Sequence, residues 1–336
     1  MSDPWRKAWL ANTDEPVIEP DRPIVDPHHH LWHEIGDRPM PYLAADFAED
    51  LKSGHRIIET VYVEARGVGY RSSGPPELRP VGETEFALEQ AVALAAASGA
   101  RMSGIVGHAD LLRGEAVAPV LEAHLAAGQG LFRGIRQSSA FDRDPAIPSH
   151  SPIEGCCFSD LGFRGGVALL GRMGLCFEAW VFHPHIREVT ALARACPDTA
   201  IMLDHYGGPL GVGDYAARRS EVFAQWRADI AELATCPNVS IKLGGLAMPM
   251  NGFGWHEQAE PPGSEALAQS QAPFFDHALA CFGPQRGMFA SNFPVEKLSC
   301  SYKVLWNAFK RLAAPLSESE KDALFRATAR RVYKLD

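Results

Sequence analysis

The chain has 336 residues, of which 46% are hydrophobic and 22% charged; this is ordinary globular composition and excludes a largely disordered or collagen-like chain. With 41 acidic and 32 basic residues, the net charge is −9, which argues against binding to nucleic acid or to an anionic membrane surface. The mean hydropathy is −0.12, and no apolar run reaches the roughly 18 residues that span a bilayer.

The N-terminal stretch lacks the apolar segment of a secretory signal, so we expect a cytoplasmic protein. The seven cysteines are odd in number and contain no C-x-x-C pair. This pattern is typical of reduced thiols rather than of a disulfide framework or a thiolate zinc site.

Eight short apolar runs of β-type composition recur along the chain, with amphipathic segments between them. The predicted strands are Ile24–His30, Ile58–Glu64, Ser103–Gly107, Leu131–Arg136, Leu175–Phe182, Ala200–His205, Val239–Leu243 and Gly287–Asn292. The predicted helices include Glu83–Ser98, Glu115–Ala127, Arg187–Ala195, Glu221–Thr235 and Tyr302–Leu312, followed by one that opens at the capping box Ser317-x-x-Glu320 and runs toward Tyr333.

Alternating strands and helices predict parallel pairing with right-handed crossovers, and eight such units predict an α/β fold of the closed (β/α)8 type, a TIM barrel. We expect a single barrel domain over residues 1–336, with residues 1–22 as an N-terminal extension. A doubly wound open sheet is the alternative, which the lack of G-x-G-x-x-G after the first strand weakens.

Three connections that follow predicted strands are long, namely Ala65–Gly82, Gln137–Ser159 and Gly244–Pro273. In a barrel, such loops after strands two, four and seven lie at the C-terminal rim, where active sites are built. Long ordered loops in compact domains are usually functional, so we expect these three to cover a site.

The motif IVDPHHHLW ends the first predicted strand. Residues two apart on a strand share a face, so His28 and His30 should point together into the barrel mouth while His29 points away. Two imidazoles there are half of a metal site or a pair of hydrogen-bonding groups. Asp26 lies one layer deeper and could accept a hydrogen bond from one of the rings.

Two later strand ends also close on histidine. Strand six ends in MLDHYGGP, which provides Asp204 and His205. Strand five ends in WVFHPH, and either the set that ends at His183 or the alternate set with Glu178 and Trp180 could face inward. We favour His183, because Pro184 ends the strand there.

Several charged or polar residues on other strands could reach the same mouth. Arg136, nearer the strand end than Arg133, could pair with a substrate carboxylate, because guanidinium groups bind carboxylates through two parallel hydrogen bonds. Glu64 ends strand two and could be a base, a metal ligand or a partner for an arginine. Lys242 adds positive charge if it faces inward, and Asn292 is the candidate on strand eight.

Taken together, these strand ends resemble the amidohydrolase superfamily, and within it the branch of TIM-barrel hydrolases that includes lactonases for pyrone dicarboxylates and sugar lactones. The resemblance runs from Ile24 to about Leu335 and rests on IVDPHHHLW, LFRGIRQ, LDHYGGP and FASNFPVEK in the expected order. Asn292 stands where that family usually has an aspartate that acts as a base or metal ligand. No lysine ends strand four, which argues against a carbamate-bridged two-metal site.

The resemblance implies a hydrolase that opens a lactone or cleaves an ester of a small, carboxylated ring compound. The residues expected to act are His28, His30, His205, Asn292 and Glu64 in catalysis, Arg136, Arg133, Arg66, Lys242 and Trp255 in substrate binding, and His28, His30 and His183 as ligands of one zinc ion. Catalysis without a metal is an equal alternative, because the aspartate is missing and parts of the branch work without metal.

Two other functions stay open from the sequence. One is zinc-dependent, non-oxidative decarboxylation of an aromatic acid in the same pocket. The other is a barrel that binds a ligand without converting it, as the change to Asn292 would permit. We expect an anionic small-molecule substrate in each case, and a homo-oligomer is possible.

Overall fold

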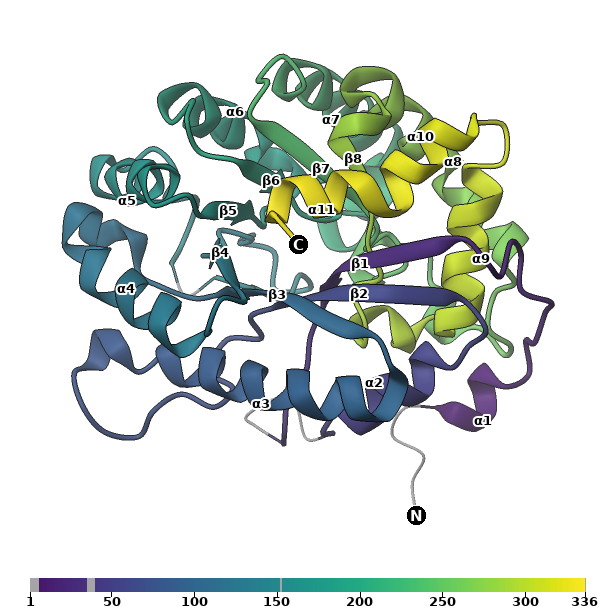
Figure 1. The fold of residues 1–336 in the computed structure, drawn as a ribbon. Coiled ribbons are helices and arrows are strands. Elements are labelled where there is room, and N and C mark those ends of the chain that lie inside the picture. The colour runs from purple at the N-terminus through teal and green to yellow at the C-terminus, as the bar shows by residue number, and fades with distance from the viewer. Residues whose placement is uncertain (1–5, 35–39, 152, 336) are drawn as a thin grey trace.

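The computed structural model describes residues 6–34, 40–151 and 153–335. Eight parallel strands follow one another around a barrel in sequence order, as predicted (Figure 1). The strands are β1 (Pro23–His29), β2 (Arg56–Val63), β3 (Arg101–Gly107), β4 (Phe132–Arg136), β5 (Cys176–Ala179), β6 (Ile201–Leu203), β7 (Val239–Leu243) and β8 (Gly287–Phe289).

The barrel closes between β1 and the segment that follows β8. The Asn292 N–H donates to the His28 carbonyl at 2.8 Å, and the His30 N–H donates to the Phe293 carbonyl at 2.7 Å. His29 and Phe293 form a parallel bridge. The same backbone that completes the barrel therefore joins the histidine motif to Asn292.

Helices surround the strands and cover the outer faces of the barrel (Figure 1). They are α1 (Lys7–Leu10), α2 (Ala44–Leu51), α3 (Val81–Ser98), α4 (Ala118–Ala127), α5 (Leu161–Arg172), α6 (Ile186–Ala195), α7 (Arg219–Leu233), α8 (Ser264–Phe282), α9 (Tyr302–Leu312), α10 (Glu318–Asp322) and α11 (Thr328–Tyr333). The predicted capping box is present, since the Ser317 side chain accepts the N–H of Glu320 and the Glu320 carboxylate accepts the N–H of Ser317.

Alternation along the strands separates two hydrophobic clusters. Outward residues such as Ile105, Ile135 and Phe177 pack against the helices. Inward residues such as Cys176 and Met202 join the C-terminal residues in a second cluster. The members of that cluster are Val25, Val61, Val63, Val106, Cys176, Met202, Met288, Ala329, Tyr333 and Leu335. The helix α11, which packs on β1 and β8, thus supplies part of the barrel filling (Figure 1).

Several predicted boundaries are wrong: the strands predicted to end at Phe182, His205 and Asn292 end at Ala179, Leu203 and Phe289. The loop after β7 was expected to extend through Pro273, whereas α8 begins at Ser264 and contains Pro273 in its interior. A proline inside a helix costs about 3 kcal/mol through the lost hydrogen bond and a steric clash. Leu267, Phe275 and Ala278 are buried on both sides of Pro273, and their packing offsets that cost.

The segment before β1 runs along α9. The Asn307 amide donates to Glu15 Oε1 at 2.8 Å, and Lys310 Nζ donates to the Ile18 carbonyl at 2.8 Å. Within the described ranges, no helix combines the length and the apolar character that crossing a membrane requires.

Candidate active site

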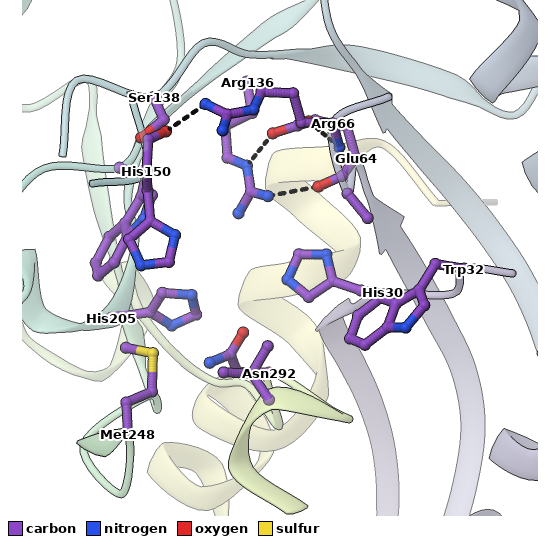
Figure 2. A pocket seen from close by; sticks show the side chains of 13 residues that line it. His30, Trp32, Glu64, Arg66, Arg136, Ser138, His150, His205, Met248 and Asn292 are labelled. Carbon is purple, nitrogen blue, oxygen red and sulfur yellow. Dashed lines mark hydrogen bonds and ion pairs between the residues drawn. The ribbon is translucent and has the colours of Figure 1, made fainter. Parts of the chain in front are cut away.

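A cavity of about 140 Å³ opens at the C-terminal ends of the strands, where the sequence places the site (Figure 2). The residues that line it are His30, Trp32, Glu64, Ala65, Arg66, Arg136, Ser138, His150, Trp180, His205, Met248, Asn292 and Val295. Six of the predicted site residues thus surround one cavity. Five come from the ends of five different strands, namely His30, Glu64, Arg136, His205 and Asn292, and the sixth, Arg66, comes from the loop after β2.

The two β1 histidines lie at different depths. His28 is fully buried, and its Nε2 lies 3.1 Å from Nε2 of His30, which lines the cavity. His30 Nδ1 lies 2.8 Å from the Val63 carbonyl and therefore carries a proton. Burial, together with the charge of Lys242, holds the pKa of His28 well below its usual range, so its ring is neutral at neutral pH.

His205 follows β6 and faces the cavity opposite His30 (Figure 2). Its backbone is left-handed, with φ of +52°, which aims the ring at the barrel axis. The ring centroid lies 4.4 Å from that of His28 and 5.0 Å from that of Trp180. Burial lowers the pKa of His205 to about 3, so the ring is neutral at neutral pH.

Arg136 and Glu64 form a buried ion pair on the cavity wall, with Nε and Oε1 2.7 Å apart (Figure 2). The guanidinium of Arg136 keeps the pKa of Glu64 below its usual range against the effect of burial. The second carboxylate oxygen accepts the N–H of Arg66 at 2.7 Å. The carboxylate that Arg136 binds is therefore one from its own chain.

Below the cavity, Lys242 of β7 faces inward and is fully buried. Its Nζ lies 2.7 Å from Glu178 Oε2, 3.2 Å from Asp204 Oδ1 and 2.9 Å from His28 Nδ1. Lys242 does not line the cavity, so it could reach a substrate only through His28. Tyr333 closes this cluster from the C-terminal helix by donating to Glu178 Oε1 at 2.6 Å.

The inward set of β5 is the one with Glu178 and Trp180, so our preference for His183 is wrong. The strand β5 ends at Ala179, and the alternation does not continue to His183. His183 instead accepts the N–H of Leu210 at 3.3 Å, and its ring packs on Tyr215. Within the described residues, it is not part of any cluster that could hold a metal ion.

Asn292 is buried, with a left-handed backbone at φ of +54°, a conformation that Asn and Asp tolerate better than most residues. Its side chain points into the cavity between His30 and His205 (Figure 2). Its amide interacts with the buried carboxyl of Glu296, whose pKa is raised by burial to about 8, although Nδ2 makes no hydrogen bond of standard geometry to the described residues. A group in the cavity would therefore compete with Glu296 for this donor.

Three further residues that were predicted to belong to the site lie away from the cavity in the structure. Arg133 Nη1 bonds to the carbonyls of Gly130 and Phe132, and Trp255 packs on Phe253 rather than on the lining. Asp26 bonds to no histidine ring; it accepts from the hydroxyls of Ser291 and Tyr302 at 2.6 and 2.9 Å. Asp26 thus holds β1 against the end of β8, because its Oδ1 also accepts the N–H of Ser291.

The lining also contains residues that sequence reasoning missed, namely Trp32, Ala65, Ser138, His150, Met248 and Val295, together with Trp180, which it named only as an alternative. Most come from the βα loops, whose paths no periodic pattern reveals. Trp32 and Val295 could have been found, because each lies close in sequence to a motif already recognised.

The sequence profile of the amidohydrolase family matches residues 25–335, and the chain belongs to this family of hydrolases. An uncharacterized protein y4mH of Sinorhizobium fredii is 32% identical over 94% of this chain and 99% of its own length. An L-fucono-1,5-lactonase of Burkholderia multivorans is 30% identical over 93% of this chain and 96% of its own. A crystal structure of a Burkholderia multivorans amidohydrolase with bound zinc aligns with a TM-score of 0.71 at 27% identity, covering 94% of this chain and all of the other.

A zinc ion does not fit at His28, because the Lys242 ammonium already contacts both this ring and the carboxylate of Asp204. His28, Asp204 and His205 bring donor atoms within 4.8 Å of one another. However, Nδ1 of His28 faces the Lys242 ammonium at 2.9 Å, and Nε2 faces an Arg136 nitrogen at 3.4 Å. Both ring nitrogens are thus flanked by cations, whereas a zinc ion needs an open lone pair at about 2.0–2.1 Å.

Proposed function

We propose that this protein hydrolyses the lactone of a small sugar acid. The observation that carries the proposal is the arrangement around the cavity: a neutral imidazole of His205, the amide of Asn292 and the guanidinium of Arg136 face one space. Ring opening of a lactone needs a base for water and donors for the carbonyl oxygen. The 30% identity with an L-fucono-1,5-lactonase over nearly both chains supports this substrate class.

In the proposed reaction, the lactone carbonyl oxygen accepts hydrogen bonds from Asn292 Nδ2 and the Arg136 guanidinium. His205 takes a proton from a water molecule as the water oxygen attacks the carbonyl carbon. The tetrahedral intermediate then collapses with cleavage of the ring C–O bond, and the His205 imidazolium returns the proton to the leaving alkoxide. The products are the open hydroxy acid and the neutral imidazole.

The charges near the cavity favour a neutral, hydroxylated ring. Arg136 is already neutralised by Glu64, and Asp204 Oδ2 lies 3.6 Å from the same guanidinium. A substrate carboxylate would therefore have to rely on Arg66, whose Nη1 donates to the His150 carbonyl at 3.1 Å. Polar loop residues such as Ser138 and His150 are suited to bind hydroxyl groups.

The test is a substrate panel assayed by proton release, with L-fucono-1,5-lactone, other aldonolactones and a pyrone dicarboxylate. We expect a neutral aldonolactone to be hydrolysed with kcat/KM of about 10⁴ M⁻¹s⁻¹ or more, as is common for enzymes. If no lactone is opened above its spontaneous rate, the proposal is wrong.

The same panel separates the two alternatives. Release of CO2 from hydroxylated benzoic acids would identify a decarboxylase. Saturable binding of a lactone in calorimetry, without any turnover, would identify a ligand-binding barrel.

A further inference from the structure

Lys242 places a positive charge at the centre of the barrel. Its side chain extends from the middle of β7, has no solvent exposure, and ends among His28, Glu178 and Asp204. Two of these three residues, His28 and Asp204, also belong to the cluster that could otherwise hold a metal ion. The lysine ammonium thus lies among groups that would attract a divalent cation.

We propose that the Lys242 ammonium takes the place of a catalytic metal ion in this chain and fixes the tautomers of His28 and His30. A zinc ion at His28 Nδ1 would lie against the ammonium, 2.9 Å from that nitrogen. A zinc ion at His28 Nε2 would lie against Arg136, 3.4 Å away. In either position, a doubly charged zinc ion would lie beside a buried cation, and the repulsion between the two would weaken zinc binding.

The tautomers follow from groups that can only donate or only accept. Lys242 and Arg136 can only donate, and they face Nδ1 and Nε2 of His28 at 2.9 and 3.4 Å, whereas a neutral ring has only one accepting nitrogen. The shorter contact, with Lys242, makes Nδ1 the acceptor, so the proton of the His28 ring is on Nε2 and the Arg136 contact is not a hydrogen bond. A carbonyl accepts, so His30 Nδ1 donates to Val63 and leaves His30 Nε2 as an acceptor. The distance of 3.1 Å between the two Nε2 atoms then corresponds to donation from His28 to His30.

Lys242 is therefore a positioning residue that acts on the cavity through His28 and His30. Any effect of this relay on lactone hydrolysis rests on the function proposed above. The metal content and the histidine tautomers can both be measured without a substrate. These two parts of the proposal therefore do not depend on the proposed lactonase function.

The first experiment measures metal content in the full-length protein. After dialysis against EDTA and incubation with Zn²⁺ or Co²⁺, we expect less than about a tenth of an ion per wild-type chain after gel filtration, because the cations at His28 repel it. Lys242→Met removes the ammonium but keeps the side-chain length, and should retain about one Co²⁺ with the visible absorption of a coordinated ion.

The matched control is Lys310→Met. Lys310 is also buried and lies 2.8 Å from a histidine nitrogen, on His55, but its other partners are the carbonyls of Ile18 and Glu19. No Co²⁺ should bind there. One tightly held zinc ion per wild-type chain would overturn the proposal, and so would a Lys242→Met chain that folds but gains no more cobalt than the control.

If Lys242→Met does not fold, the tautomers of the wild-type histidines test the proposal instead. Nitrogen-15 NMR of the wild-type histidines should show His28 protonated on Nε2 and His30 protonated on Nδ1. The opposite tautomer at His28 would overturn the proposal. A metal-free protein with these tautomers but no lactonase activity would refute the proposed function alone, whereas an active lactonase with bound zinc would refute this inference alone.

Discussion

Gly245 lies directly against the imidazole of His205, so that a Cβ on Gly245 would come within 2.5 Å of the ring Cγ and Nδ1. The residue also has φ of +87°, which favours glycine. The loop after β7 therefore limits where the proposed base can lie.

We expect Gly245→Ala to displace the His205 ring and to lower kcat by at least about tenfold, since small misplacements of a catalytic group are costly. Gly130→Ala is the control, because Gly130 has φ of +89° and nothing within 4 Å of its Cβ position. Both variants bear the backbone strain of about 1–2 kcal/mol, visible in urea unfolding. Equal activity of the two variants would show that contact with Gly245 does not position His205.

His205→Gln should lower kcat by about 10²–10⁴ with a small change in KM, because it removes the proposed proton acceptor. His183→Gln is the matched control, since His183 is a buried histidine outside the cavity and should retain near wild-type turnover. Steady-state kinetics on the best lactone of the panel measures both. Wild-type kcat in His205→Gln would remove this residue from the mechanism.

Because the pKa of His205 is lowered to about 3, its imidazole stays neutral from about pH 5 to about pH 8. The proposed mechanism therefore predicts a kcat without the inflection near pH 6.5 that an ordinary histidine base produces. A pH–rate profile checks this, and a limb with a pKa near 6.5 that disappears in His205→Gln would contradict the lowered pKa.

Asn292→Asp should lower kcat by about 10²–10³, because it exchanges an amide donor for a carboxylate beside the negative charge of the intermediate. The change keeps the side-chain shape and suits the left-handed backbone at this position. A gain of activity would instead mean that Asn292 disables an ancestral site, which favours the ligand-binding alternative.

Glu64→Gln should destabilise the fold by about 3–5 kcal/mol, because it removes the nearer ion-pair partner of the buried Arg136 guanidinium and leaves only Asp204 at 3.6 Å. The freed guanidinium should also raise kcat/KM for a carboxylated lactone relative to a neutral one by about tenfold. Urea unfolding and the substrate panel measure the two effects. Unchanged specificity would show that Arg136 does not contact the substrate.

Burial lowers the pKa of His29 to about 3, and His29 lies outside the cavity, stacked on Phe47. The unfolded chain binds a proton at this residue below about pH 6.5 and the folded chain does not, so stability falls as the pH falls through that range. His29→Gln should reduce the loss of unfolding free energy between pH 7 and pH 5 by about 2 kcal/mol relative to wild type. An equal loss in both proteins would contradict the lowered pKa.

The order of the strands could be predicted because strands and helices alternate along the chain with right-handed crossovers. The inward direction of His28 and His30 could be predicted because residues two apart on a strand share a face. The same rule could not decide β5, where the strand ends at Ala179 before it reaches His183. Pro273 led to a predicted loop that is too long, because the tertiary packing of α8 outweighs the effect of a proline inside the helix.

Lys242 shows what a strand pattern leaves open. Its inward direction was uncertain from the sequence, and its three partners come from β1, β5 and the end of β6. Whether side chains from different strands meet depends on the register of the barrel strands and on the lengths of the side chains. Ion pairs such as Arg136 with Glu64 are hidden in the same way, although both residues were recognised singly.

The hydrogen bond from Tyr333 to Glu178 ties the helix α11 to the floor below the cavity. Glu178 and Lys242 are contributed by strands that are synthesised well before this helix. During translation, the floor therefore gains the Tyr333 hydrogen bond only after α11 has left the ribosome, and the polar centre of the barrel is among the last parts of the molecule to form.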